Sequence, residues 1–126
     1  MGLVMEVPMT ESTPYVLIDE DAGYMRFKGE CYSENTVAFF KNITNWLAAY
    51  LDSEFDLLTF DCELEYFNSS SSKLLYNILK SMDAAAAAGK KIIVNWRVDG
   101  ANDILVECGE DFEDELKYLK FNIVKQ

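Results

Sequence analysis

Residues 55–82, FDLLTFDCELEYFNSSSSKLLYNILKSM, change from one hydrophobic period to another across four consecutive serines. Before the serines, apolar and polar side chains alternate over residues 55–67, which predicts a strand with one buried face. That face is predicted to carry Leu58, Phe60, Cys62, Leu64 and Tyr66. After the serines, apolar residues recur every three or four positions, which predicts an amphipathic helix that continues through five alanines and ends at Gly89. The stretch therefore predicts one strand-to-helix unit of an α/β fold.

The residues before this unit show the same two periods. Residues 15–18 and 24–28 alternate on the two sides of Asp21-Ala22-Gly23, which predicts an antiparallel hairpin. Residues 34–51 repeat apolar side chains at three and four positions, so we expect a helix there with Ser33 as its N-cap. Residues 1–13 are expected to form a loosely ordered segment ahead of the hairpin.

The residues after Gly89 extend the pattern toward the C-terminus. Residues 91–98, KIIVNWRV, alternate again and predict a strand. A third helix is expected to follow an Asn102 cap and to run to Leu116, and residues 121–125, FNIVK, predict a final short strand.

The predicted order of elements is ββαβαβαβ, which indicates an α/β fold. Strands separated by helices favour right-handed crossovers and parallel pairing, whereas a hairpin is antiparallel, so the sheet of about five strands should be mixed. Because the strands alternate instead of being apolar throughout, we expect the helices mainly on one face. The length of 126 residues and the apolar content of 50% predict a single domain over residues 1–126.

The charge of the chain excludes two classes of partner. There are 22 acidic against 11 basic residues, giving a formal net charge of −11. Such a surface repels nucleic-acid phosphates and anionic membranes, so we expect neither nucleic acid nor a membrane as a partner. The N-terminal residues lack the pattern of a signal peptide, and no apolar run is long enough to span a bilayer. We therefore expect a cytoplasmic protein.

The residue types present also exclude common kinds of catalysis. The chain has no histidine, which removes histidine-dependent triads, the common zinc sites and histidine phosphorelay. The cysteines Cys31, Cys62 and Cys108 are widely spaced and odd in number, so we expect reduced thiols rather than a disulfide or metal framework. The acidic residues 109–115, GEDFEDE, are expected to form a solvated helix face, with a docking surface as the alternative. We predict no catalytic residue, no metal ligand and no cofactor.

Residues 68–73, NSSSSK, lie between the predicted strand and the predicted helix, and three interpretations of them remain open. Serine is a preferred N-cap, because its hydroxyl accepts a hydrogen bond from an unpaired backbone N–H. A helix N-terminus also suits a phosphoryl group, with Lys73 within one turn. Ser70-Ser71-Ser72-Lys73 matches the S-x-x-K acyl-serine motif, but the companion motifs S-D-N and K-T-G are missing from the sequence. A serine-nucleophile enzyme with Lys73 as base, or a small-ligand-binding domain using this loop, is the alternative function.

Several motifs in order make nearly the whole chain resemble the SiaC family of bacterial regulatory phosphoproteins. They are TP and DEDAGYMRFKGECYSEN near the start, then YFNSSSSK, VNW and GEDFEDEL. The family looks like the anti-sigma-factor-antagonist (STAS) fold, in which a serine or threonine at the start of a helix is phosphorylated by a partner kinase. The resemblance implies that the phosphoacceptor is Ser69, directly after Asn68. The rest of the phosphosite loop would be Asn68, Ser70, Ser71, Ser72 and Lys73.

The resemblance also implies a function for the whole domain. It predicts a non-catalytic signalling switch whose partners are a serine/threonine protein kinase, a PP2C-like phosphatase and an effector protein such as a diguanylate cyclase. This chain has serine where the family often has threonine, which is chemically compatible with phosphorylation. It also has Ser33 where the family often has proline before Glu34-Asn35, a difference at the start of the first long helix.

Overall fold

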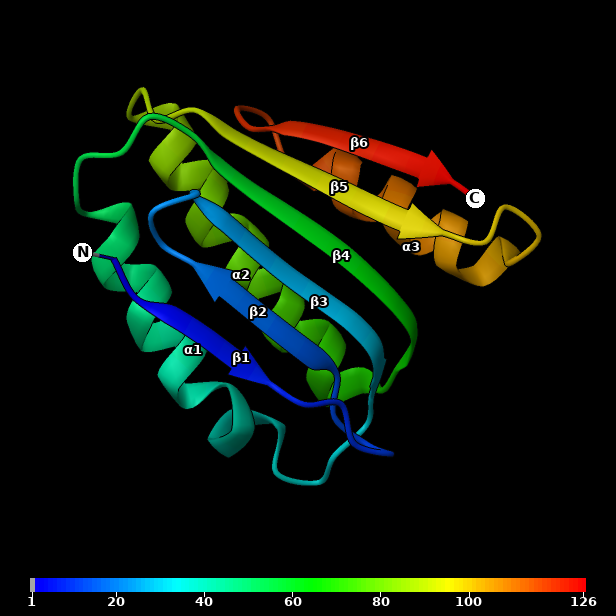
Figure 1. Ribbon diagram of the computed structural model, residues 1–126. Coiled ribbons are helices and arrows are strands. Elements are labelled where there is room, and N and C mark those ends of the chain that lie inside the picture. The colour runs from blue at the N-terminus through cyan, green and yellow to red at the C-terminus, as the bar shows by residue number, and fades with distance from the viewer. Residues whose placement is uncertain (1) are drawn as a thin grey trace.

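The strand predicted before the serines lies inside a six-stranded sheet, in a computed structural model that describes residues 2–126. The sheet and its three helices are drawn in Figure 1. In chain order, the elements are β1 (Val4–Val7), β2 (Tyr15–Asp19), β3 (Tyr24–Cys31), α1 (Thr36–Leu51), β4 (Leu58–Phe67), α2 (Ser69–Ala87), β5 (Ile92–Val98), α3 (Asp103–Glu115) and β6 (Lys120–Lys125).

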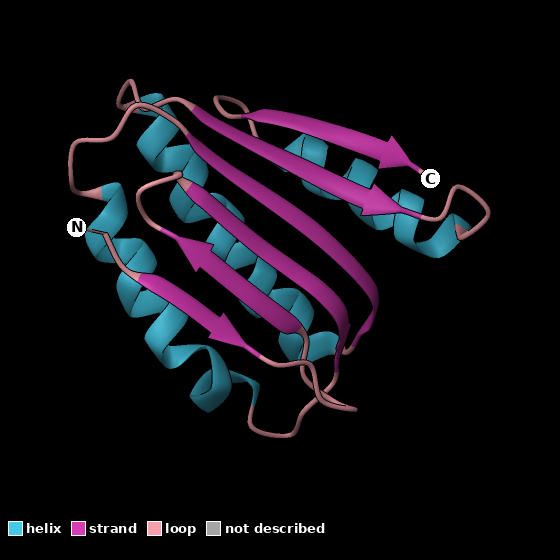
Figure 2. Cartoon of the chain, viewed as in Figure 1, coloured by secondary structure: helices cyan, strands magenta, loops and turns pink. Residues whose placement is uncertain are grey.

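The strands lie side by side in the order of the chain, from β1 to β6. The pairs β1–β2 and β2–β3 are antiparallel, and the pairs β3–β4, β4–β5 and β5–β6 are parallel. Each parallel connection advances by one strand in the same direction, and right-handed crossovers then place every helix on the same face. Figures 1 and 2 show α1, α2 and α3 on one face of the sheet. The predicted mixed sheet with helices on one face is confirmed.

The first strand was absent from the predicted order, which becomes βββαβαβαβ with β1 included. β1 lies within residues 1–13, for which the sequence predicts a loosely ordered segment. It pairs antiparallel with β2, with Val4 opposite Asp19 and Val7 opposite Val16. The segment has four residues and Val4 is exposed, so it carries too little alternation to reveal a strand. The segment forms a strand because it pairs with β2, and its own sequence does not indicate this.

Alternate residues of the strands form the core beneath the helices. The largest fully buried side chains include Trp96, Phe27, Phe60, Met25 and Leu79. Burial of each large apolar side chain stabilises the fold by about 1.5–3 kcal/mol. The opposite face of the sheet is polar, and there Asp61 accepts hydrogen bonds from Tyr24 and Asn95. One face of the sheet is apolar and the other is polar, which explains why apolar and polar residues alternate along the strands.

A bulge near the end of β4 changes which side chains face the core. Gly29 of β3 pairs with Leu64, but the next residue, Glu30, pairs with Tyr66, so Glu65 is an extra residue in β4. Tyr66 is 53% exposed, and Phe67 packs edge-on against Trp96 instead. The prediction that Tyr66 belongs to the buried face is therefore wrong.

The start of α3 and the end of α2 agree with the predictions, and the start of α1 differs. Asn102 caps α3 by accepting a hydrogen bond from Leu105 N–H. Gly89, with φ of +104°, ends α2 as predicted. α1 begins at Thr36, and Ser33 is not its N-cap. The Ser33 hydroxyl accepts a hydrogen bond from Asn35 N–H, before the helix starts, and its carbonyl accepts one from the Thr36 hydroxyl.

No helix within residues 2–126 combines the length and the apolar character needed to cross a membrane. Cys31 and Cys62 are buried, Cys108 is half-buried, and all three are free thiols.

Candidate functional site

Asn68 starts α2 and fixes the position of the serines. Its side-chain oxygen accepts a hydrogen bond of 2.9 Å from Ser71 N–H, so Asn68, rather than a serine, is the N-cap. Its backbone N–H donates to the carbonyl oxygen of Cys31 at 3.2 Å, which ties the cap to the end of β3. The four serines therefore form the first turn of the helix.

The four serines differ sharply in exposure. Ser69 and Ser70 are exposed, Ser72 is half-buried, and Ser71 is only 3% exposed. The Ser71 hydroxyl accepts a hydrogen bond of 3.1 Å from the Cys31 thiol. The Ser71 hydroxyl also lies 3.4 Å from the Thr36 hydroxyl. Because the Thr36 hydroxyl donates its own proton to the Ser33 carbonyl, Ser71 is the donor to Thr36. Ser71 is thus a structural residue of the core, out of reach of another protein.

Ser69 lines an open groove of about 540 Å³ beside the start of α2. Ser72 and Lys73 line the same groove, together with the aromatic side chains of Phe67, Tyr76 and Phe112. Ser70 does not line it. The predicted phosphoacceptor therefore lies between an aromatic surface and a lysine.

The backbone at the start of α2 can bind an anion. Within residues 2–126, no group accepts a hydrogen bond from the backbone N–H of Ser69 or Ser70. These N–H groups lie at the positive end of the helix dipole, and the Lys73 ammonium is one turn away. The oxygens of a phosphate on Ser69 would therefore lie near both the unpaired backbone N–H groups and the Lys73 ammonium.

An acidic surface borders the groove on α3. A second hollow shares Tyr76 and Phe112 with the groove and is also lined by Asp111, Asp114 and Glu115. All three acidic side chains are exposed, which confirms the predicted solvated face. A dianionic group on Ser69 would add to this negative charge.

Asp83 holds the chain after α3 in place and was not singled out in the sequence. Its carboxylate is buried and accepts hydrogen bonds from the backbone N–H groups of Lys117, Tyr118 and Leu119. Burial by itself raises the pKa of Asp83, but these three donors outweigh burial and lower the pKa below its usual value. The alanines that follow Asp83 predict a helix, but they do not indicate which groups the Asp83 carboxylate binds. Its position on the apolar side of α2, next to Met82, was the available signal.

The geometry gives little support to the catalytic alternative. A lysine that activates a serine needs dry surroundings, whereas Lys73 is exposed. No group of three or more metal-ligating side chains is gathered in a metal-binding arrangement within residues 2–126.

Comparison with known proteins identifies similar chains along almost the whole length. The family model described as SiaC family regulatory phosphoprotein matches residues 7–126. An uncharacterised protein of Pseudomonas aeruginosa strain UCBPP-PA14 is 29% identical over 114 residues, which cover 90% of each chain. The crystal structure of apo-SiaC from Pseudomonas aeruginosa superposes with a TM-score of 0.91 at 28% identity, covering 98% of this chain and 99% of that one. The crystal structure of the diguanylate cyclase SiaD in complex with its activator SiaC, from the same species, gives a TM-score of 0.92 at 29% identity, covering 97% and 99%.

Proposed function

The chain belongs to the SiaC family of regulatory phosphoproteins, and from that premise we propose that it is a signalling switch controlled by reversible phosphorylation of Ser69. Membership of this family makes it a regulator rather than an enzyme. A serine/threonine protein kinase adds the phosphate and a PP2C-like phosphatase removes it. The effector is a diguanylate cyclase, by analogy with the Pseudomonas aeruginosa SiaC that activates SiaD. ATP and its metal ion belong to the kinase, and the exchange takes place in the cytoplasm.

The exposure of Ser69 on the aromatic groove is the observation that carries this proposal. A protein kinase needs a hydroxyl that it can reach, and Ser71 offers none because its side chain is buried. Ser70 is exposed but lies outside the groove, and Ser72 is half-buried. Ser69 alone among the four serines is both exposed and part of the groove.

The groove also suggests how the phosphate changes binding. In the unmodified protein, the rings of Phe67, Tyr76 and Phe112 offer a surface on which an effector can bury apolar side chains. Phosphorylation adds about −1.5 to −2 charges at the edge of that surface. Binding must then desolvate a dianion beside the acidic residues of α3. A penalty of about 1.4 kcal/mol already weakens binding tenfold.

The test combines phosphosite mapping with a binding measurement. Intact-mass and fragmentation analysis of protein purified from its own cells should place one phosphate on Ser69. The Ser69→Ala variant should carry none, and the matched Ser70→Ala variant should be phosphorylated like the wild type. Binding to the diguanylate cyclase should weaken at least about tenfold on phosphorylation. Phosphate on Ser71 or Ser72, or undiminished phosphorylation of Ser69→Ala, would overturn the assignment.

A further inference from the structure

The bulge near the end of β4 turns an aromatic side chain toward solvent close to Ser69. Glu65 is the extra residue of β4, so Tyr66 leaves the buried face and is 53% exposed. Phe67, the next residue, points to the helix side of the sheet and lines the groove. Bulges commonly redirect side chains next to functional sites. The exposure of Tyr66 is therefore better explained by binding than by packing within the domain.

Tyr32 supports the Tyr66 ring. The two ring centroids are 5.9 Å apart, and the ring planes are tilted by 60°. The backbone N–H of Tyr32 donates to the Ser12 carbonyl at 2.9 Å, and the carbonyl of Cys31 accepts a hydrogen bond from Asn68 N–H, so both rings are held at the start of α2 (Figure 1). Tyr32 and Tyr66 are called the tyrosine pair below. Side chains that are already ordered lose little conformational entropy on binding.

The tyrosine pair and the aromatic groove lie on either side of Ser69. Tyr66 and Phe67 are consecutive in β4 and point to opposite faces of the sheet, and only Phe67 lines the groove. Ser69 follows Tyr66 by three residues, so at most about 11 Å separate their Cα atoms. Aromatic side chains are therefore present on both sides of the predicted phosphoacceptor.

An effector that binds at Ser69 needs a larger surface than the groove provides. A stable protein–protein interface buries about 800 Å² on each partner, which is a patch roughly 28 Å across. The groove contributes the rings of Phe67, Tyr76 and Phe112 on one side of Ser69 only. A patch of that size centred on Ser69 extends beyond the tyrosine pair. Tyrosine is also among the residues that contribute most to binding near the centre of an interface.

The charges beside the tyrosine pair are mainly acidic. Burial raises the pKa of Tyr32, and the charges of Glu11 and Glu30 raise it further. Glu65, the bulge residue, is exposed, whereas Lys28, two residues before Glu30 in β3, supplies one positive charge. A partner surface with arginine or lysine side chains fits here, because these cations pair with carboxylates and also stack on tyrosine rings.

We propose that Tyr66 is a binding residue for the effector and that the tyrosine pair extends the effector interface from the groove across Ser69 to the other face of the sheet. The inference rests on the proposed function and deepens it: the occupant is a surface of the diguanylate cyclase that carries apolar and basic side chains. Ser69 then lies inside the interface instead of at its rim. A phosphate on Ser69 must therefore lose its water on both sides when the effector binds.

Variants of Tyr66, titrated with the diguanylate cyclase by calorimetry, test the contact. Tyr66→Ser removes the exposed ring and should weaken binding at least about tenfold. Tyr66→Phe restores the ring and should bind at least about fivefold more tightly than Tyr66→Ser. The control Tyr118→Ser removes a ring that is 64% exposed in the link between α3 and β6, where Tyr118 N–H donates to Asp83, and it should bind like the wild type.

A charge reversal tests the predicted basic character of the partner. Glu11→Lys changes an exposed residue beside Tyr32 and should weaken binding at least about threefold. Unchanged binding in Glu11→Lys would contradict the basic partner surface even if Tyr66→Ser failed to fold.

A double-mutant cycle tests whether the effector encloses Ser69. Phosphoserine introduced at position 69 during translation provides each modified protein without the kinase. It should weaken binding at least about tenfold in the wild type, but by no more than about threefold in Tyr66→Ser, because the phosphate then keeps part of its water. Equal weakening in the two backgrounds would contradict the enclosure of Ser69.

The failure of this inference can be told apart from the failure of the proposed function. If the unmodified wild type binds no diguanylate cyclase, or if phosphoserine at position 69 leaves binding unchanged, both fail together. If phosphoserine weakens binding but Tyr66→Ser binds like the wild type, only the role of the tyrosine pair is refuted. An equal loss in Tyr118→Ser and Tyr66→Ser would also refute it, because the effect would not depend on the position of the ring.

Discussion

The thiol of Cys31 donates a hydrogen bond of 3.1 Å to the hydroxyl of Ser71. This contact joins the end of β3 to the first turn of α2 inside the core, and it separates Ser71 from its three serine neighbours. Ser71 contributes to stability, whereas Ser69, two residues earlier, is exposed and available for modification.

Introducing a negative charge should separate the roles of these two serines. Ser71→Asp places a carboxylate in the core and should lower the free energy of unfolding by about 2 kcal/mol or more. Ser69→Asp places the same group at the exposed first position of α2, where the helix dipole favours it, and stability should change by less than about 1 kcal/mol. Urea denaturation followed by circular dichroism measures both. Equal losses in the two variants would show that the exposure of the serines is assigned wrongly.

The helical period could have predicted the burial of Ser71 from sequence. Ser71 precedes Leu75 by four residues and Ile78 by seven, so it lies on the same side of α2 as these two buried residues. Ser69 and Ser70 fall outside that stripe. Periodicity also predicts the three helices and five of the six strands, since each must bury one face against the sheet.

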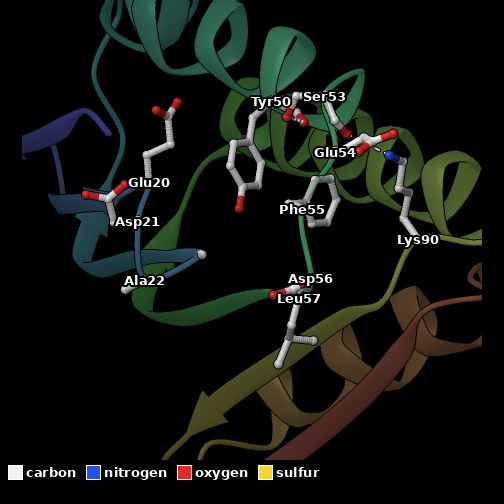
Figure 3. A pocket seen from close by; sticks show the side chains of 11 residues that line it. Glu20, Asp21, Ala22, Tyr50, Ser53, Glu54, Phe55, Asp56, Leu57 and Lys90 are labelled. Carbon is white, nitrogen blue, oxygen red and sulfur yellow. Dashed lines mark hydrogen bonds between the residues drawn. The ribbon is translucent and has the colours of Figure 1, made fainter. Parts of the chain in front are cut away.

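Other features depend on pairings between distant segments and leave no local signal. The bulge at Glu65 arises from the register between β3 and β4, so the exposure of Tyr66 could not be predicted from β4 alone. An open hollow of about 930 Å³ around Tyr50, shown in Figure 3, is formed by the turn at residues 20–23 and the loop at residues 53–57, which approach each other only in the folded chain. A family resemblance specified Ser69, whereas residue patterns left capping and phosphorylation as alternatives.

Asp83 should make stability depend on pH in the acid range. Its folded-state pKa is lowered by three backbone donors, so the unfolded chain binds this proton more readily. The stabilisation is therefore complete above the unfolded pKa of about 3.9 and is lost as the pH falls through the lower folded-state pKa. Asp83→Asn should cost about 1–3 kcal/mol at neutral pH.

The difference between the wild type and Asp83→Asn should shrink as the solution is acidified toward about pH 3. Urea midpoints measured at several pH values test this, with the exposed Asp114→Asn as a charge-matched control that should follow the wild type. A difference that stays constant across the range would rule out Asp83 as the titrating group.

Gly109 should reverse the usual effect of an alanine substitution in a helix. In most helices, replacing an interior glycine by alanine stabilises by up to about 1 kcal/mol. Here a Cβ atom at residue 109 would lie 2.6 Å from Cδ1 of Trp96, a buried ring whose N–H donates to the Leu105 carbonyl. Gly109→Ala should therefore lower the free energy of unfolding by about 1–3 kcal/mol. Glu110→Ala, at the next and exposed position, should be nearly neutral, and a more stable Gly109→Ala would contradict this packing.

Phosphorylation of Ser69 should change binding without unfolding the domain. Ser69 is the first residue of α2, where unpaired N–H groups and the helix dipole favour a phosphate. The modified protein should therefore be as stable as the unmodified protein, or more stable by up to about 1 kcal/mol. In the same samples, affinity for the proposed effector, a diguanylate cyclase, should fall at least about tenfold. Thermal melts and binding titrations on phosphorylated and unphosphorylated protein make the comparison, with Ser69→Ala treated identically as the control. If the melting temperature fell together with the affinity, loss of structure rather than repulsion at the groove would explain the switch.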